Sequence, residues 1–188
     1  SNLSIERGAA SQNLGLFGCI KGAEIVNLTL ENARITGGSR IGTLVGAALA
    51  DAAGGKANLI GNCHATGTVT AMGTAVIKQT DAGGLVGIND GNTDGQTGQS
   101  IYSAIDGSSA HVTVIANTGS ADRAESGHVG GFVGWNKGMI TNCLAEGSVD
   151  GGNTTGGFAG SNYGSIYNSH AIGAVTAGYT AGGFVGSS

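Results

Sequence analysis

The chain has 188 residues and a net charge of −4, with 38 glycines, no proline and only 11% charged residues. Because each interior glycine costs a helix roughly 1 kcal/mol relative to alanine, a helical bundle is excluded, and the absence of proline excludes collagen. Eight Lys and Arg residues against twelve Asp and Glu residues argue against a nucleic-acid partner, and no apolar run is long enough to span a membrane.

A motif of a large apolar residue, a second apolar residue and a glycine recurs along the whole chain. Its copies are Leu16-Phe17-Gly18, Leu44-Val45-Gly46, Leu85-Val86-Gly87, Phe132-Val133-Gly134, Phe158-Ala159-Gly160 and Phe184-Val185-Gly186. The last three copies are 26 residues apart and the earlier ones lie 28 to 47 apart, which predicts insertions in the longer units. We expect units near residues 14–38, 42–80, 83–127, 130–155 and 156–181, and a partial unit at 182–188. Since this last unit is incomplete, we expect further repeats in a longer parent chain.

The second half of the unit also aligns between copies. It runs from Ile60 to Val69, from Ile140 to Val149 and from Ile166 to Val175, with weaker copies beginning at Ile25 and Ile101. Small and apolar side chains alternate within it, as at Thr141, Cys143 and Ala145, and this period of two is typical of a strand. A unit this short cannot bury its own apolar face, whereas a stack of units can. The sequence therefore predicts an all-β fold, a β-helix-like β-solenoid of about five to six stacked repeat units with insertions.

Stacking places equivalent residues in columns, one strand spacing of about 4.8 Å apart. We expect a core ladder of large apolar residues, a narrow alanine column and an amide ladder. Their members are Leu16, Leu44, Leu85, Phe132, Phe158 and Phe184; Ala65, Ala145 and Ala171; and Asn27, Asn62, Asn142 and Asn168. The Asn-x-Gly turns at 89–91, 136–138 and 162–164 are expected to supply the positive-φ positions.

Residues 130–149 (GGFVGWNKGMITNCLAEGSV) and 156–175 (GGFAGSNYGSIYNSHAIGAV) resemble the GLUG motif, whose core stands here as Gly84-Leu85-Val86-Gly87. The resemblance extends in looser form over residues 14–188. Such repeats occur in bacterial adhesins and in non-catalytic regions of immunoglobulin A-specific metallopeptidases. The resemblance therefore implies an extracellular or cell-surface segment with an adhesive or spacer role, and it transfers no catalytic residue.

Catalytic motifs are absent from the sequence. None of the four histidines is followed by Glu, which excludes the His-Glu-x-x-His motif of metallopeptidases, and Gly-x-Ser-x-Gly is also missing. The acids are scattered along the chain, whereas acid/base catalysis by two carboxylates requires them within roughly 5–10 Å. We predict that the chain is not an enzyme, and a carbohydrate-active β-helix enzyme is a minor alternative.

The segment from Asp90 to Gly95 matches the first half of a calcium-binding loop. Asp90, Asn92 and Asp94 would supply alternating oxygen ligands, with Asp81 or backbone carbonyls completing the shell. The twelfth position, normally Glu, is Ile101, so an EF-hand is excluded. The other reading is an ordinary Asn- and Asp-rich turn inside an insertion, and no other cofactor is expected.

Two of the three cysteines share a repeat position. The alignment puts Ala104 between Cys63 and Cys143, so the two thiols lie two strand spacings apart, beyond disulfide range. We expect them to be buried free thiols.

Trp135 differs from its counterparts in the other units, which are Cys19, Ala47, Ile88, Ser161 and Ser187. Together with Tyr163, Tyr167 and Tyr179 it would form an aromatic platform for a sugar ring or a protein partner. Alternatively, Trp135 packs under the insertion at 101–127.

Three functions follow from these observations. The first is a non-catalytic adhesion module that binds a protein or glycan ligand on a host or neighbouring cell. The second is a structural stalk without a ligand, and the third is the carbohydrate-active enzyme named above.

Overall fold

The computed structural model describes residues 2–51, 53–72, 80–93, 98, 100–116 and 127–188, with only the backbone of 92 and 93. Throughout these ranges the chain forms short strands joined by turns, and they contain no helix. It follows that no helix in the described ranges is long and apolar enough to cross a membrane. The expected all-β class is confirmed.

Most of the described strands lie in four sheets, which we name A to D, and all neighbours within these sheets run parallel. Sheet A contains β1 (Asn2–Glu6), β5 (Thr29–Gly37), β9 (His64–Ala71), β15 (Ser109–Ala116), β19 (Leu144–Glu146), β20 (Val149–Asp150), β24 (His170–Ile172) and β25 (Val175–Thr176). Sheet B contains β2 (Gln12–Leu14), β6 (Ser39–Ile41), β10 (Thr80–Gly83), β16 (Gly127–Gly130), β21 (Thr154–Gly156) and β26 (Thr180–Gly182).

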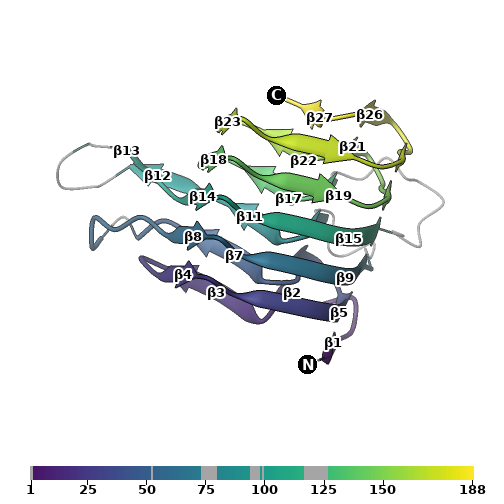
Figure 1. The fold of residues 1–188 in the computed structure, drawn as a ribbon, viewed down its shortest axis with the longest axis horizontal. Coiled ribbons are helices and arrows are strands. Elements are labelled where there is room, and N and C mark those ends of the chain that lie inside the picture. Colours follow the sequence, from purple (N-terminus) through teal and green to yellow (C-terminus); the bar gives the residue numbers. More distant parts are fainter. Residues whose placement is uncertain (1, 52, 73–79, 94–97, 99, 117–126) are drawn as a thin grey trace.

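Sheet C contains β3 (Phe17–Lys21), β7 (Val45–Leu49), β11 (Val86–Asn89), β17 (Val133–Asn136), β22 (Ala159–Asn162) and β27 (Val185–Ser187). Sheet D contains β4 (Glu24–Val26), β8 (Leu59–Gly61), β14 (Ala104–Asp106), β18 (Met139–Thr141) and β23 (Ser165–Tyr167). Within each sheet the strands follow chain order, so the N- and C-terminal ends of the chain lie at opposite ends of the stack (Figure 1). The result is a β-helix-like arrangement of parallel strands in stacked sheets.

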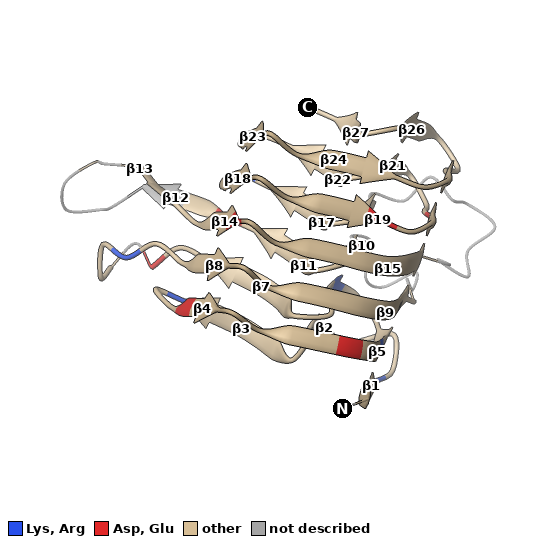
Figure 2. Ribbon diagram, viewed as in Figure 1, with Lys and Arg blue, Asp and Glu red and all other residues tan. Residues whose placement is uncertain are grey.

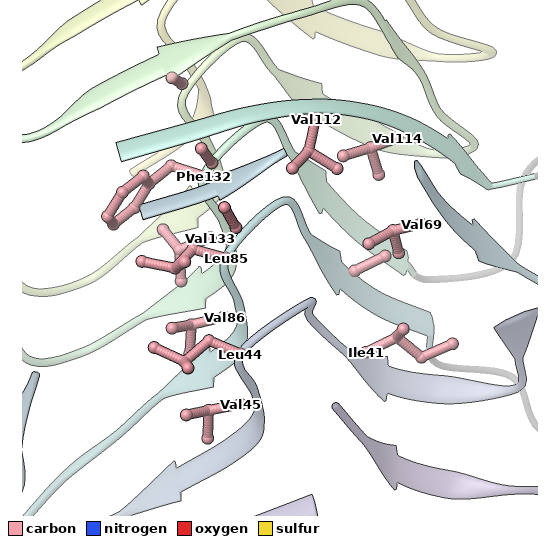
Figure 3. Packing of buried hydrophobic residues seen from close by; sticks show 14 of the residues in the cluster. Ile41, Leu44, Val45, Val69, Leu85, Val86, Val112, Val114, Phe132 and Val133 are labelled. Atoms are coloured by element: carbon pink, nitrogen blue, oxygen red, sulfur yellow. The ribbon is translucent and has the colours of Figure 1, made fainter. Parts of the chain in front are cut away.

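The apolar residues of the repeated motif form the core, as expected. Leu44, Leu85 and Phe132 lie one above another beside the parallel column of valines (Figure 3). The ladder continues through stacked rings, with centroids 4.8 Å apart between Phe132 and Phe158 and 4.9 Å apart between Phe158 and Phe184. Leu16 departs from this prediction because it is 38% exposed. It belongs to the first rung of sheet C, where β3 has a neighbour on one side only.

Corners between sheets D and A need a left-handed residue, and asparagine supplies it. Asn27, Asn62, Asn142 and Asn168 have φ values of 57°, 49°, 54° and 46°, and Gly107 takes this place in the third unit with φ 58°. The amide ladder forms in two pieces, since Asn62 Nδ2 donates to Asn27 Oδ1 (2.7 Å) and Asn168 Nδ2 to Asn142 Oδ1 (3.5 Å). Gly107 interrupts it because glycine carries no amide side chain.

The prediction for the Asn-x-Gly turns is wrong. A positive φ occurs neither at the asparagines of these turns (Asn89, Asn136 and Asn162) nor at their glycines (Gly91, Gly138 and Gly164). These asparagines instead form a second amide ladder, in which Asn89 Nδ2 donates to Asn136 Oδ1 (2.8 Å) and Asn136 Nδ2 to Asn162 Oδ1 (2.7 Å). Buried amides that pair with each other along the stack avoid the cost of unsatisfied polar groups.

The alignment of the third unit is also wrong, by four residues. β12 (Gly91–Thr93) and β13 (Ser100–Tyr102) form an antiparallel pair outside the four sheets, and this pair removes Ile101 from the stack. Ile105 takes the buried place between Ile60 and Ile140. As a consequence, Ser108 and not Ala104 lies between Cys63 and Cys143, and its hydroxyl accepts a hydrogen bond from the Cys63 amide (3.0 Å).

Sheets B and C approach each other closely where the motif glycines lie. A Cβ at Gly160 would stand 2.6 Å from both Gly134 O and the backbone carbon of His128, and one at Gly87 would stand 2.6 Å from Ile41 N. Real Cβ atoms essentially never come that near to backbone atoms. The glycine of the motif is therefore required by backbone-to-backbone packing.

We expect Gly160→Ala to lower the free energy of unfolding by about 2 kcal/mol, because overpacking at a site walled by backbone typically costs 1–3 kcal/mol. Gly183→Ala is the matched control, since a Cβ at Gly183 would meet nothing within 4 Å. Chemical denaturation of both variants measures the difference. Equal stability of the two variants would contradict close packing between sheets B and C.

The expectation for the paired cysteines is confirmed, since both thiols are free and buried, whereas Cys19 is free and exposed. Burial raises the pKa of the Cys143 thiol to about 12, and burial also raises the pKa of Cys63. A thiol held neutral and covered reacts slowly with disulfide reagents, because the thiolate is the nucleophile.

We expect a thiol reagent at mildly alkaline pH to modify Cys19 alone in the native protein and all three cysteines after denaturation. Cys19→Ser should abolish the rapid native reaction. Fast native reaction of the Cys19→Ser variant would show that Cys63 or Cys143 is open to solvent.

Candidate functional site

Two columns of side chains run along the outer side of the junction between sheets B and C. The register of sheet C aligns Trp135 with Cys19, Ala47, Ile88, Ser161 and Ser187, as the sequence alignment predicts. In sheet B, Asp81 pairs with His128, and Ala82 pairs with Ile41. Arg40, which directly precedes Ile41, therefore lies in register with Asp81, which directly precedes Ala82. An aromatic and aliphatic column therefore lies beside a column of charged and polar residues.

Glycine places these two columns next to each other. Gly134, which precedes Trp135, lies against the backbone of β10, where a Cβ would stand 2.6 Å from Ala82 N and 2.9 Å from the backbone carbon of Asp81. The same close packing that stabilises the fold thus brings the strand of Trp135 against the strand of Asp81.

A cavity of about 340 Å³ opens between the columns, lined by Arg40, Leu49, Asp81, Ile88, Asp90 and Trp135. Two of these residues mark the start of insertions in neighbouring units: Leu49 ends β7, and Asp90 follows β11. Trp135 is half-buried, so one part of its indole packs against the protein and another part is open to the cavity.

The charged groups of the cavity are held by neighbours. Asp81 is 1% exposed, and its Oδ1 lies 2.7 Å from His128 Nδ1. Burial raises the pKa of Asp90, while the positive charges of Lys137 and Arg40 act in the opposite direction. Two carboxylates, Asp81 and Asp90, thus line the site together with the guanidinium of Arg40, and the charge of Lys137 acts on Asp90.

The aromatic platform is present only in part. Trp135 and Tyr163 contact each other, with ring centroids 6.1 Å apart and planes tilted by 51°, and Tyr163 is 62% exposed. Tyr167 ends β23, and Tyr179 directly precedes β26, which Figure 1 places at the opposite side of the stack from β23. Neither lines the cavity beside Trp135. The grouping of four aromatic residues is therefore wrong for Tyr167 and Tyr179, because β23 and β26 belong to different sheets.

A second hollow of about 230 Å³ adjoins Tyr163 and is lined by Tyr102, Gly138, Met139, Tyr163, Gly164 and Ser165. Sequence reasoning missed Tyr102, since it aligned Ile101-Tyr102 with Ile166-Tyr167, and the antiparallel pair of β12 and β13 shifts that alignment. Tyr102 and Met139 are 53% and 43% exposed, so this hollow carries exposed apolar surface.

Sequence reasoning placed Asp81 beside Asp90 only as a calcium ligand and otherwise treated the acids as scattered, and it missed Arg40 and His128. Asp81 and Asp90 do line one cavity, together with Arg40. A signal for the column exists in the sequence: Arg40, Asp81 and His128 each stand two residues before the first glycine of their motif, at Gly42, Gly83 and Gly130.

The calcium hypothesis is only partly open to inspection. Asp90 lines the cavity, and Asn92 belongs to β12, whose extended backbone pairs with β13; Asp94 lies outside the described residues. Over the described part of the chain, no three His, Cys, Asp or Glu side chains gather as they would to hold a metal ion. Calcium binding at Asp90, Asn92 and Asp94 stays a prediction.

Charged residues are sparse along the described strands, and the Lys and Arg positions form no continuous stripe on the ribbon (Figure 2). The expectation that nucleic acid is not a partner rests on this charge pattern and on the composition, and it stays a prediction. The Trp135 cavity is the place where charge and aromatic surface come together.

The comparisons with known proteins agree with the repeat motif. Residues 125–150 match the family model described as the GLUG motif, a segment that includes His128 and Trp135. No curated protein matches the chain. A crystal structure of a Bacteroides ovatus protein, described as a candidate immunoglobulin A1 protease, is similar in fold with a TM-score of 0.54 and 18% identity. The similarity covers 100% of this chain and 66% of that one, so the chain spans just under two thirds of the neighbour's length. The chain thus carries a GLUG motif on a β-helix-like framework of stacked parallel strands.

Proposed function

We propose that this chain is a non-catalytic binding module of a bacterial cell-surface or secreted protein, built as a β-solenoid of five units and the start of a sixth. Strands that follow chain order in every sheet support the solenoid, because a chain that visits sheets B, C, D and A in turn produces that order. The insertions expected at 47–58 and 89–127 are shorter than the sequence indicates, because β7, β14 and β15 belong to the stack. The antiparallel pair of β12 and β13 lies outside the four sheets, and insertions of this kind are where repeat proteins commonly carry their binding residues.

The observation that carries the binding function is Trp135 beside its cavity. The other units have small or aliphatic residues at this position, and a tryptophan there adds a large, half-buried aromatic surface next to Arg40, Asp81 and Asp90. Partly enclosed apolar surface with a few convergent polar groups is the usual composition of a ligand site.

The extracellular location is supported by the GLUG motif, since repeats of this kind occur in secreted and surface proteins. The Bacteroides ovatus neighbour is described as a candidate protease of immunoglobulin A1, but at 18% identity it supports the fold alone. A role as a non-catalytic part of such a protein agrees with the absence of peptidase motifs in this sequence.

The test is binding of the purified chain to an array of glycans and extracellular-matrix proteins, with calcium and again with EDTA. We expect saturable binding that weakens at least about tenfold in Trp135→Ala, a loss of about 1.4 kcal/mol, typical of a truncated aromatic contact residue. Tyr179→Ala is the matched control, because Tyr179 is 81% exposed and lies away from the cavity. Circular dichroism confirms that each variant is folded.

Other results would reject the proposal. A blank array with folded protein would favour a stalk without a ligand. Release of new reducing ends from an array polysaccharide would favour the carbohydrate-active enzyme. Binding that is lost in EDTA would not reject the proposal: it would show that a divalent cation is required, and Asp90, Asn92 and Asp94 would be the first ligands to substitute.

A further inference from the structure

The Trp135 cavity has a composition that selects one chemical class of ligand. Its walls combine an aliphatic and aromatic side, formed by Leu49, Ile88 and Trp135, with a charged side, formed by Arg40, Asp81 and Asp90. A ligand that fills it must therefore present an apolar face and a polar edge.

The mixed charge of the cavity favours a neutral ligand. Asp81 Oδ1 lies 2.7 Å from His128 Nδ1, and Asp90 is opposed by Arg40, which lines the same cavity, and by Lys137, whose charge acts on Asp90. A cationic ligand would be repelled by Arg40 and Lys137, and an anionic ligand would be repelled by Asp81 and Asp90. Unpaired charge in a partly buried site is costly.

The polar side offers both donors and acceptors in fixed positions. The guanidinium of Arg40 only donates hydrogen bonds, and a carboxylate only accepts them. Asp81 is oriented by His128 at 2.7 Å and is almost fully buried, so its position does not have to be organised on binding. Hydroxyl groups match such a site, because each hydroxyl both donates and accepts.

The apolar side offers the complement to a ring. Trp135 presents part of its indole to the cavity, with Ile88 one rung away in the same column. A cavity of about 340 Å³ lies at the small end of ligand sites, which suits a single ring and not an extended peptide. Tyr163, with its ring centroid 6.1 Å from that of Trp135, lies where a neighbouring group of a longer ligand would pass.

We propose that this cavity binds one neutral pyranose residue of a glycan, with the C–H face of the sugar on Trp135 and its hydroxyls on Arg40 and Asp90, while the buried pair of Asp81 and His128 supports the polar side from behind. This inference rests on the proposed binding function and assigns the ligand class of the same site. Longer glycans continue over Tyr163 towards the hollow that Tyr102 and Met139 line.

Trp135 is the single tryptophan of the chain, so its fluorescence reports directly on the cavity. The probes are the methyl glycosides of glucose, galactose and mannose and N-acetylglucosamine, titrated to about 100 mM against the wild-type chain. We expect at least one neutral sugar to change the emission saturably with a Kd of about 1–10 mM, as is reasonable for one small ring. Glucuronate and glucosamine are the charged probes, and both should bind at least about tenfold more weakly than the best neutral sugar.

Asp90→Asn tests the location without disturbing the buried Asp81 and His128 pair. It removes one cavity charge, and we expect the Kd of the best neutral sugar to rise at least about fivefold. Asp150→Asn is the matched control, because Asp150 is exposed at β20 in sheet A, and it should bind as the wild type does. Denaturation midpoints confirm that both variants are folded.

Three results would overturn the inference: no saturable change with any neutral sugar, tighter binding of a charged probe, or unchanged binding by Asp90→Asn. The array distinguishes this failure from that of the proposed function. If the chain binds on the array, Trp135→Ala abolishes that binding and neutral sugars leave the fluorescence unchanged, then only the ligand class is wrong. A blank array together with silent fluorescence makes the binding function wrong as well.

Discussion

Backbone-to-backbone packing of sheets B and C is the constraint on which the rest of the structure depends. At Gly87, Gly134 and Gly160 the opposing strand comes so near that a Cβ would stand within 3 Å of backbone atoms. Any side chain there would force the two sheets apart and open the core behind them. The glycine of the motif is therefore a packing residue, and it recurs because this junction recurs in each unit.

The repetition of the motif also links buried amide side chains of successive units by hydrogen bonds. The amides of Asn89, Asn136 and Asn162 are joined by hydrogen bonds from one rung to the next. The central Asn136 both accepts from Asn89 and donates to Asn162, whose own amide donates to the carbonyl of Gly164 (3.2 Å). Stacked phenylalanine rings do the same for apolar surface, since each ring of Phe132, Phe158 and Phe184 covers the next.

The candidate site arises where the repeat departs from its own rule. Trp135 stands where the other units have a small or aliphatic residue, and three different side chains, Arg40, Asp81 and His128, occupy one column of sheet B. The close packing of sheets B and C at the motif glycines keeps the two columns side by side, so a substitution in either column changes the surface that both of them form. A framework of this kind separates stability, which the repeated positions supply, from recognition, which the varied positions supply.

The sequence by itself determined the strand period, the columns of the core and the register of Trp135, because residues at equal places in a repeat must stack if the apolar face is to be buried. Only the tertiary structure decided the register of the third unit, since the pairing of β12 with β13 makes Ile105 and not Ile101 the buried residue. It also decided which asparagines turn the corners, because Asn142 and Asn136 carry the same amide but occupy different places in the coil. The cavity, too, was decided by the tertiary structure alone. Arg40 and Trp135 are far along the chain from Asp81 and Asp90, and the long-range pairing of successive units brings them within one site.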